Sequence, residues 1–238
     1  MEPTRPVPSV WPRPFTSRLT RREALAVLLY LPVHLVVLQL VFAFLLNRGT
    51  LDTGTANLLY YLIGFVYMVA VGFRFLRQDF DALIDAPFSC IREIARGYLA
   101  MMCFNLLLGL LFTLLPEADN PNNASIMDAV EQDGRVMKAA IVYLTPVVEE
   151  MLFRAGIFGT IRRKNRTAAY LVSALCFSLY HVAVYAVLNP LYWMFLLQYL
   201  PVSLLLARCY ERTNSIWCSI FFHMLVNGIS LSALNAAA

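Results

Sequence analysis

The sequence predicts an all-α fold: a polytopic membrane helical bundle of about seven transmembrane helices, with the N-terminus in the cytoplasm. Three observations lead to this prediction. Of the 238 residues, 60% are hydrophobic and only 14% are charged, whereas soluble domains average about half apolar and a quarter charged. Seven apolar runs are long enough to cross a hydrocarbon core, which takes roughly 17–25 residues. The lysine and arginine residues alternate between loops as one membrane orientation requires.

The first predicted element is a basic cytoplasmic tail, residues 1–23, which is rich in arginine and proline. It leads into the first apolar run, near residues 24–46. A cleaved signal peptide has a shorter apolar stretch of roughly 7–15 residues, and it is not followed by further spans. We therefore expect this run to be a retained signal-anchor.

Three spans and an acidic outer loop form the next predicted region, residues 24–135. The spans are expected near 24–46, 56–75 and 97–115. The outer loop at 116–135 carries the acidic residues Glu117, Asp119, Asp128, Glu131 and Asp133. Its segment Ser125-Ile-Met-Asp128 fits a capping-box pattern, so either a short amphipathic helix starts there or the segment is a solvated loop.

Residues 136–238 form the last predicted region, a core of four helices. The spans are expected near 136–160, 168–187, 190–208 and 215–234. The fifth and sixth spans are joined by a tight turn at Asn189–Pro190. An odd number of spans keeps the basic loops on one side of the membrane.

The distribution of positive charge selects the orientation. With the N-terminus in the cytoplasm, 15 of the 19 lysine and arginine residues lie on the cytoplasmic side: Arg5, Arg13, Arg18, Arg21, Arg22, Arg74, Arg77, Arg92, Arg96, Arg162, Arg163, Lys164, Arg166, Arg208 and Arg212. Only Arg48, Arg135 and Lys138 lie outside, and Arg154 falls within a span. Cytoplasmic loops of membrane proteins are positive. These basic loops also favour anionic lipid surfaces, and no nucleic-acid partner is expected.

The five cysteines are scattered and show no CxxC spacing: Cys90, Cys103, Cys176, Cys209 and Cys218. Most of them lie in apolar runs. We interpret them as small core residues rather than as disulfides or metal ligands.

The fourth span contains three ionisable residues, Glu149, Glu150 and Arg154. Insertion scales assign about 2.5–3.5 kcal/mol to one Asp, Lys or Arg at a helix centre, so such residues are functional candidates by default. Glu150 and Arg154 are four residues apart and are expected to pair as a structural support. Glu149 points about 100° away and needs another partner, which is either a reaction centre or a neighbouring helix. Pro146 leaves the carbonyl of Val142 without its usual donor.

Two histidines and an asparagine are expected at a similar depth. His181 lies on the fifth span, while His223 and Asn227 share one face of the seventh. Counted from the cytoplasmic end at 1.5 Å per residue, Glu149, His181, His223 and Asn227 lie at roughly 18, 20, 13 and 18 Å. Polar residues of three helices therefore fall in one layer. His34, alone on the first span, is expected to be a packing residue.

These residues form three motifs, Glu149-Glu150-x-x-x-Arg154, Phe177-x-x-x-His181 and His223-x-x-x-Asn227. Together, in this order and on separate spans, they resemble the motifs of the CPBP family, the CAAX protease and bacteriocin-processing family, also called Abi. This family of intramembrane proteases includes the type II CAAX prenyl endopeptidases. The motifs cover residues 149–227, about a third of the chain.

The resemblance implies an intramembrane endopeptidase whose site lies among the last four helices. Glu149 and His181 would hold and activate a water, and His223 and Asn227 would steady the oxyanion. Glu150, Arg154 and Phe177 would support them. The implied partners are membrane lipid and a peptide or membrane-protein substrate, and the expected location is a prokaryotic plasma membrane. CAAX-type C-terminal processing, bacteriocin or peptide maturation, and immunity remain open, as does the oligomeric state.

The cofactor is a separate question. Glu149, His181 and His223 would form a permissible zinc set, but the HExxH signature of soluble zinc proteases is absent. We favour a glutamate–water mechanism without an obligatory metal, with zinc as the alternative.

Three other functions remain as alternatives. A catalytically silent member of the family would act as a membrane scaffold or immunity protein. A proton-coupled transporter would use Glu149 as a proton relay. An electron carrier would bind haem through His181 and His223, and it would leave Glu149 unexplained.

Overall fold

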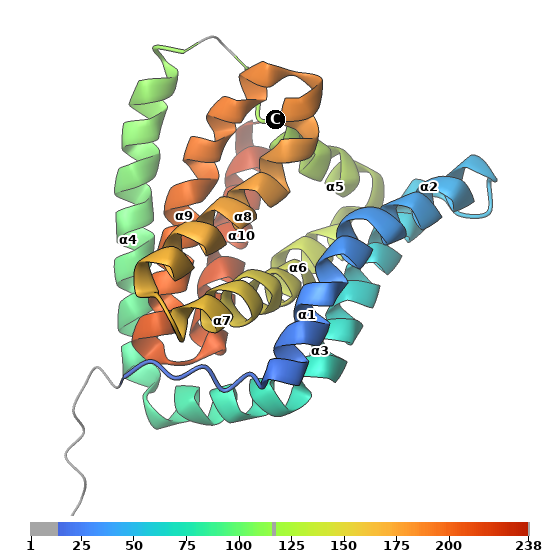
Figure 1. Ribbon diagram of the computed structural model, residues 1–238. Helices are drawn as coiled ribbons and strands as arrows, with labels where there is room; N and C mark the ends of the chain where they lie inside the picture. The colour runs from blue at the N-terminus through green and yellow to red at the C-terminus, as the bar shows by residue number, and fades with distance from the viewer. Residues whose placement is uncertain (1–13, 116–117, 238) are drawn as a thin grey trace, which may run out of the picture.

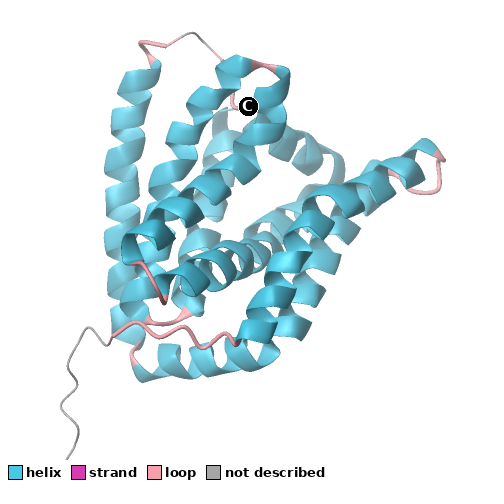
Figure 2. Cartoon of the chain, in the orientation of Figure 1, coloured by secondary structure: helices cyan, strands magenta, loops and turns pink. Residues whose placement is uncertain are grey.

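The computed structural model describes residues 14–115 and 118–237, and every regular element in these ranges is a helix (Figures 1 and 2). The predicted all-α class is therefore confirmed. Residues 1–13 of the predicted tail, with Arg5 and Arg13, lie outside the described residues, as does Glu117 of the acidic loop.

Several of the rods in Figure 1 are built from more than one helical segment, because the hydrogen-bond register changes within them. The first three rods are α1 (Arg21–Pro32) with η1 (Val33–Val37) and α2 (Leu38–Asn47), then α3 (Thr53–Asp85), then α4 (Pro87–Phe112). They are followed by α5 (Pro121–Ala139), η2 (Ala140–Leu144), α6 (Thr145–Glu149), η3 (Glu150–Phe158) and α7 (Gly159–Arg162). The chain ends with α8 (Arg166–Leu188), η4 (Pro190–Phe195), α9 (Leu196–Thr213) and α10 (Ile216–Ala237).

Six of these rods are long and apolar enough to cross a membrane: Arg21–Asn47, Thr53–Asp85, Pro87–Phe112, Arg166–Leu188, Pro190–Thr213 and Ile216–Ala236. They correspond to six of the seven predicted spans. The remaining predicted span, 136–160, is also helical, but it holds Glu149, Glu150 and Arg154 and is buried from Pro146 to Gly156. The neighbouring helices cover its charges, so they do not meet lipid.

The basic loop predicted between the second and third spans is helical instead. α3 continues to Asp85, and α4 begins at Pro87, so Arg77, Arg92 and Arg96 lie on helices. Hydropathy marks where a helix leaves the apolar layer, whereas the helix itself ends where the backbone is interrupted. Here the interruption is Ala86 (φ −146°, ψ 55°), followed by a proline at the first position of the next helix, where its missing N–H costs nothing.

The acidic outer segment is a helix, so of the two alternatives left open for it the structure shows the helix and not the solvated loop. The predicted start at Ser125 is wrong, because α5 begins at Pro121. The side chain of Asn120 accepts from the backbone N–H of Asn122 and thereby caps the helix. Pro121 fits the first position, where φ near −65° is already helical. The helix is kinked at Gly134, whose φ is +56°.

The N-terminal helices pack on the last four in one continuous apolar core. Val27 of α1 and Met68 and Phe75 of α3 are fully buried in the same cluster as Met151 and Phe158 of η3. In Figure 1 the hairpin of α1–α2 and α3 lies along one side of α6 and α7, and α4 lies on the opposite side of the bundle.

The interpretation of the cysteines as isolated core residues is wrong for two of them. Cys90 of α4 and Cys218 of α10 form a disulfide, with Cα atoms 5.5 Å apart. They are 128 residues apart in the sequence, and only the packing of α4 against α10 brings them together. The other three, Cys103, Cys176 and Cys209, are free.

Candidate active site

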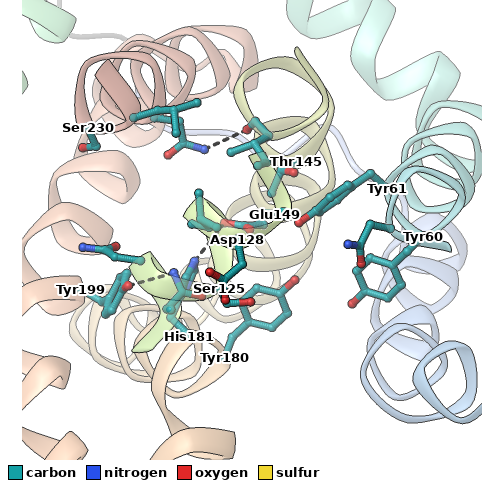
Figure 3. Close-up of a pocket in the computed structure, with 18 of the residues that line it drawn as sticks. Tyr60, Tyr61, Ser125, Asp128, Thr145, Glu149, Tyr180, His181, Tyr199 and Ser230 are labelled. Carbon is teal, nitrogen blue, oxygen red and sulfur yellow. Dashed lines mark hydrogen bonds and ion pairs between the residues drawn. The ribbon is translucent and has the colours of Figure 1, made fainter. Parts of the chain in front are cut away.

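A cavity of about 1090 Å³ lies between the N-terminal hairpin, α5 and the last helices. Its lining includes Glu149, His181, His223 and Asn227, the four residues that the sequence predicts at one depth. Figure 3 shows Glu149, His181, Tyr199 and Asp128 turned toward this common space. This volume is comparable with that of the largest common ligand pockets, which measure roughly 300–1,000 Å³.

Three different helices bring one carboxylate and two imidazoles together. Glu149 is the last residue of α6, His181 lies on α8 and His223 lies on α10. Oε2 of Glu149 is 3.7 Å from Nε2 of His181 and 3.6 Å from Nε2 of His223. All three residues lie where bulk water has little access, since Glu149 and His223 are buried and His181 is mostly buried.

The other nitrogen of each imidazole is engaged away from the cavity. Nδ1 of His181 donates to the backbone carbonyl of Phe177 at 2.9 Å, and Nδ1 of His223 donates to Oε1 of Glu150 at 2.9 Å. A carbonyl or carboxylate oxygen can only accept, so each Nδ1 carries the hydrogen. In the neutral form, each Nε2 therefore presents a lone pair toward Glu149.

Three hydrogen-bond acceptors consequently face one another: two Nε2 atoms and Oε2 of Glu149. Oε2 of Glu149 is buried and has no hydrogen-bond partner among the described residues. A buried polar group without a partner costs about 1–3 kcal/mol. A shared proton or a water donating to these acceptors removes that cost, so the arrangement suits a group that handles protons and water.

Glu150 and Arg154 make the expected buried pair, with Nη1 of Arg154 3.2 Å from Oε1 of Glu150. Both are fully buried. The guanidinium also lies 4.3 Å above the ring of Phe177, and its Nη2 donates to Oγ of Ser203 at 3.2 Å. Phe177 therefore supports the site in two ways. Its ring contacts the guanidinium of Arg154, and its backbone carbonyl accepts from Nδ1 of His181.

Glu150 has a second role that the sequence prediction missed. Its carboxylate accepts from His223 and from Oγ of Ser219, the latter at 2.5 Å. The spacing carries a signal for this, because Ser219, His223 and Asn227 are four residues apart and share one face of α10. Glu150 thus holds the catalytic-motif histidine in position as well as neutralising Arg154.

Asn227 lies farther along the same face and contacts the interrupted backbone of the fourth span. Its Nδ2 donates to the carbonyl of Ile141 at 3.2 Å. Residues 140–144 are π-helical, with the N–H of Thr145 bonded to the carbonyl of Ala140. With hydrogen bonds from residue i+5 to residue i, the missing N–H of Pro146 leaves the carbonyl of Ile141 without a backbone donor. Asn227 replaces that donor and retains a second amide hydrogen.

Tyr199 of α9 is a site residue that nothing in the sequence indicates. Its ring stacks on His181 with centroids 4.5 Å apart, and its hydroxyl accepts from Nδ2 of Asn120 and of Asn122. It therefore connects the start of α5 to the imidazole. In the sequence it is one tyrosine in an apolar run. His34 packs as expected, with Nε2 3.2 Å from the hydroxyl of Tyr180 and its ring stacked on Tyr60.

The three facing acceptor atoms are spaced slightly more widely than the ligands of a tetrahedral zinc. Two ligands of a tetrahedral zinc with bonds of 2.0–2.1 Å lie about 3.3–3.4 Å apart, whereas Oε2 of Glu149 lies 3.6 and 3.7 Å from the two imidazoles. Within residues 14–115 and 118–237, no group of three or more His, Cys, Asp or Glu residues has the arrangement of a metal site.

Comparison with known proteins agrees with the three motifs. Residues 133–229 match the family model of type II CAAX prenyl endopeptidase Rce1-like proteins. This region contains all seven motif residues. The match therefore confirms the resemblance, and it covers less than half of the chain. The motifs on α6–η3, α8 and α10 are thus those of a family of membrane proteases.

Two curated bacterial proteins are similar over the same part of the chain. "UPF0177 protein YxdF" of Lactococcus lactis subsp. lactis (strain IL1403) is 33% identical over 92 residues, which is 39% of this chain and 46% of that protein. "Putative membrane peptidase YdiL" of Bacillus subtilis (strain 168) is 28% identical over 110 residues, which is 46% of this chain and 41% of that protein. The matches therefore span less than half the length of either relative. No solved structure matches the chain significantly.

Proposed function

We propose that the chain is an intramembrane endopeptidase in which Glu149 and His181 activate a water for attack on a peptide bond. The observation that carries the proposal is the convergence of Glu149, His181 and His223 from three helices at the base of a cavity of about 1090 Å³. A packing role for these residues would not require three acceptor atoms to face one another inside a cavity.

The first step is attack by water on the scissile carbonyl. Oε2 of Glu149 accepts one proton of the water, and Nε2 of His181 accepts a hydrogen bond from the other. As the oxygen bonds to the carbonyl carbon, the proton moves to Glu149. Glu149 then returns that proton to the leaving amine as the carbon–nitrogen bond breaks. A general base positioned in this way contributes about 10²–10⁴-fold to the rate.

Stabilisation of the oxyanion falls to the two residues that the motifs suggest, but they would donate in different charge states. His223 gives its Nδ1 hydrogen to Glu150, so its Nε2 can donate only when the ring is protonated. Asn227 gives one amide hydrogen to Ile141 and retains the other for the oxyanion. We therefore assign the neutral donor to Asn227 and an imidazolium donor to His223.

The test is proteome-wide identification of new protein N-termini in membranes of cells that express the full chain or its Glu149→Gln variant. The amide keeps the size and hydrogen-bonding atoms of the carboxylate but cannot take the proton. We expect the cleavages to fall by at least about 100-fold, with the variant still inserted and as thermally stable as the parent.

The matched control is Glu131→Gln, which removes an exposed carboxylate from α5 and should leave the cleavage pattern unchanged. Equal cleavage by the parent chain and Glu149→Gln would exclude Glu149 as the base. If neither chain produces new termini while both fold, the silent scaffold becomes the better interpretation.

A further inference from the structure

We infer that the cavity receives its substrate from the non-cytoplasmic side, as an internal segment of a membrane-anchored or secreted polypeptide rather than as a free C-terminus. The inference rests on the proposed function and on the orientation that the basic residues predict. It adds the access side and the class of substrate.

The cavity lies in one half of the bundle along the membrane normal. It is lined by Leu46 at the end of α2, Thr53 at the start of α3 and Leu234 near the end of α10. These positions adjoin the turn from α2 to α3, at the upper right of Figure 1, and the C-terminus, at its top. Along α6 and α10, the lining positions farthest from that end of the helices are Glu149 and His223, so we take the cavity to open toward the α2–α3 turn and the C-terminus.

The opposite end of the bundle is closed by the segment that precedes α1, which crosses beneath the helices in Figure 1. The ring of Phe15 packs edge-on against Tyr210 at 5.0 Å and against Phe158 at 5.7 Å. Leu19 is 1% exposed. These side chains pack against the core below η3, so a polypeptide cannot reach Glu149 from this end without displacing them.

Ion pairs reinforce the closed end. Nη1 of Arg18 donates to Oδ1 of Asp79 at 2.8 Å and to the carbonyl of Asn214 at 2.7 Å. Arg162 and Arg166 both bind Glu211. These arginines belong to the basic set that the positive-inside rule places in the cytoplasm. The cavity mouth, at the other end, therefore faces away from the cytoplasm.

The cavity wall determines which segment fits. Among the described residues that line it, none is lysine or arginine, and the charged groups are the carboxylates Asp128 and Glu149. The other polar groups are mostly amides, hydroxyls and phenols, such as Gln39, Asn57 and Tyr185. A free C-terminal carboxylate would meet no cation and would be repelled by both acids. A neutral or basic stretch of backbone meets donors and acceptors for its amides.

Cysteine labelling tests the access side independently of activity. We expect a membrane-impermeant maleimide to label Ser230→Cys, in the cavity wall, in intact cells that lack an outer membrane. The exposed native Cys103 is replaced by serine in every variant, and the same chain without a new cysteine measures background labelling. Gln39→Cys, a lining position on α2, repeats the measurement if Ser230→Cys fails to fold.

The control is Arg92→Cys, at an exposed position near the start of α4. It should be labelled only after the membrane is permeabilised. Labelling of Arg92→Cys in intact cells, together with labelling of the cavity positions only after permeabilisation, would overturn the inference.

The substrate class is tested by the positions of the Glu149-dependent cleavages. We expect them in non-cytoplasmic segments and more than ten residues from a C-terminus. Cleavages confined to cytoplasmic C-terminal tails would overturn the inference while leaving the proposed peptidase intact. A lack of Glu149-dependent cleavage, with labelling as expected, would instead contradict the proposed function and leave the orientation of the cavity established.

Discussion

At the residue scale, the buried charges of the site fall into two groups. Glu150, Arg154 and His223 are linked by direct contacts, with 2.9 Å between His223 and Glu150 and 3.2 Å between Glu150 and Arg154. Glu149 has no such partner, because the atoms nearest to Oε2 are two imidazole nitrogens that both accept. The adjacent glutamates thus differ, because Glu150 is paired and Oε2 of Glu149 has no hydrogen-bond partner among the described residues, as the proposed general base requires.

Glu150→Gln should destabilise the protein by about 3–5 kcal/mol, because it leaves the charge of Arg154 buried without its partner. The amide oxygen still accepts from His223, so the change removes mainly the negative charge. Adding Arg154→Met should restore part of the loss, since both buried charges are then gone. Denaturant unfolding of the purified chain in detergent measures both effects. Losses that simply add in the double variant would show that the two side chains are not coupled.

At the element scale, α5 lines the cavity, is linked to α9 at its start and is kinked near its end. The start of α5 is linked to Tyr199 through Nδ2 of Asn120 (3.2 Å) and Nδ2 of Asn122 (3.0 Å). Its other end changes direction at Gly134, whose backbone (φ 56°, ψ −126°) is outside the helical region. This geometry places Ser125 and Asp128 over the cavity (Figure 3).

Gly134→Ala should lower the free energy of unfolding by more than about 1 kcal/mol, because a side chain is strained at this positive φ. Gly109→Ala, in regular helix on α4, is the matched control and should stabilise by about 0.5–1 kcal/mol. An added Cβ meets nothing within 4 Å at either position, so only the backbone conformation differs. Thermal unfolding in detergent gives the comparison, and equal shifts for both variants would contradict this account of the kink.

Tyr199→Phe should loosen α5 without disturbing the ring that stacks on His181. Loss of the hydroxyl removes the acceptor for Asn120 and Asn122, at a cost of about 1 kcal/mol. Amide hydrogen exchange in residues 120–126 should become faster. Tyr192→Phe is the control, because the Tyr192 hydroxyl has no hydrogen bond in the described part of the chain. Unchanged exchange in α5 would show that these hydrogen bonds do not hold the helix.

At the scale of the whole molecule, apolar side chains cover the outer faces of the helices, and ionisable groups lie buried between them. Large apolar side chains are exposed on many outer helix faces, among them Leu25 (58%), Leu106 (70%) and Leu188 (83%). In water such a surface would aggregate, whereas in a bilayer it faces lipid. The protein is thus an integral membrane protein, and its core buries the ionisable groups that lipid would not accept.

Leu19→Ala should destabilise the protein by about 2–5 kcal/mol, the usual cost of a cavity at a fully buried leucine. Leu25→Ala, six residues away on the lipid-facing side, should cost much less, because little packed volume is lost. Leu19 is 1% exposed and Leu25 is 58% exposed. Unfolding in the same detergent compares them. Equal losses would show that the segment before α1 is not part of the core.

The sequence by itself determined the fold class, the approximate positions of the helices and the four motif residues that line the cavity. These properties are local or periodic. Membrane spans follow from the length of apolar runs, and ionisable residues inside a span are informative because they are costly there. The pairing of Glu150 with Arg154 follows from helical spacing alone.

Only the tertiary structure decided how these groups are connected. The bond from Glu150 to His223 joins residues 73 apart in sequence, and the bond from Asn227 to Ile141 joins residues 86 apart. The Cys90–Cys218 disulfide and the contact of Tyr199 with His181 likewise depend on which helices are neighbours. Spacing along one helix specifies a face, but the partner of that face is set by packing. The chemistry of the site follows from that packing, because it determines which nitrogen of each imidazole is free.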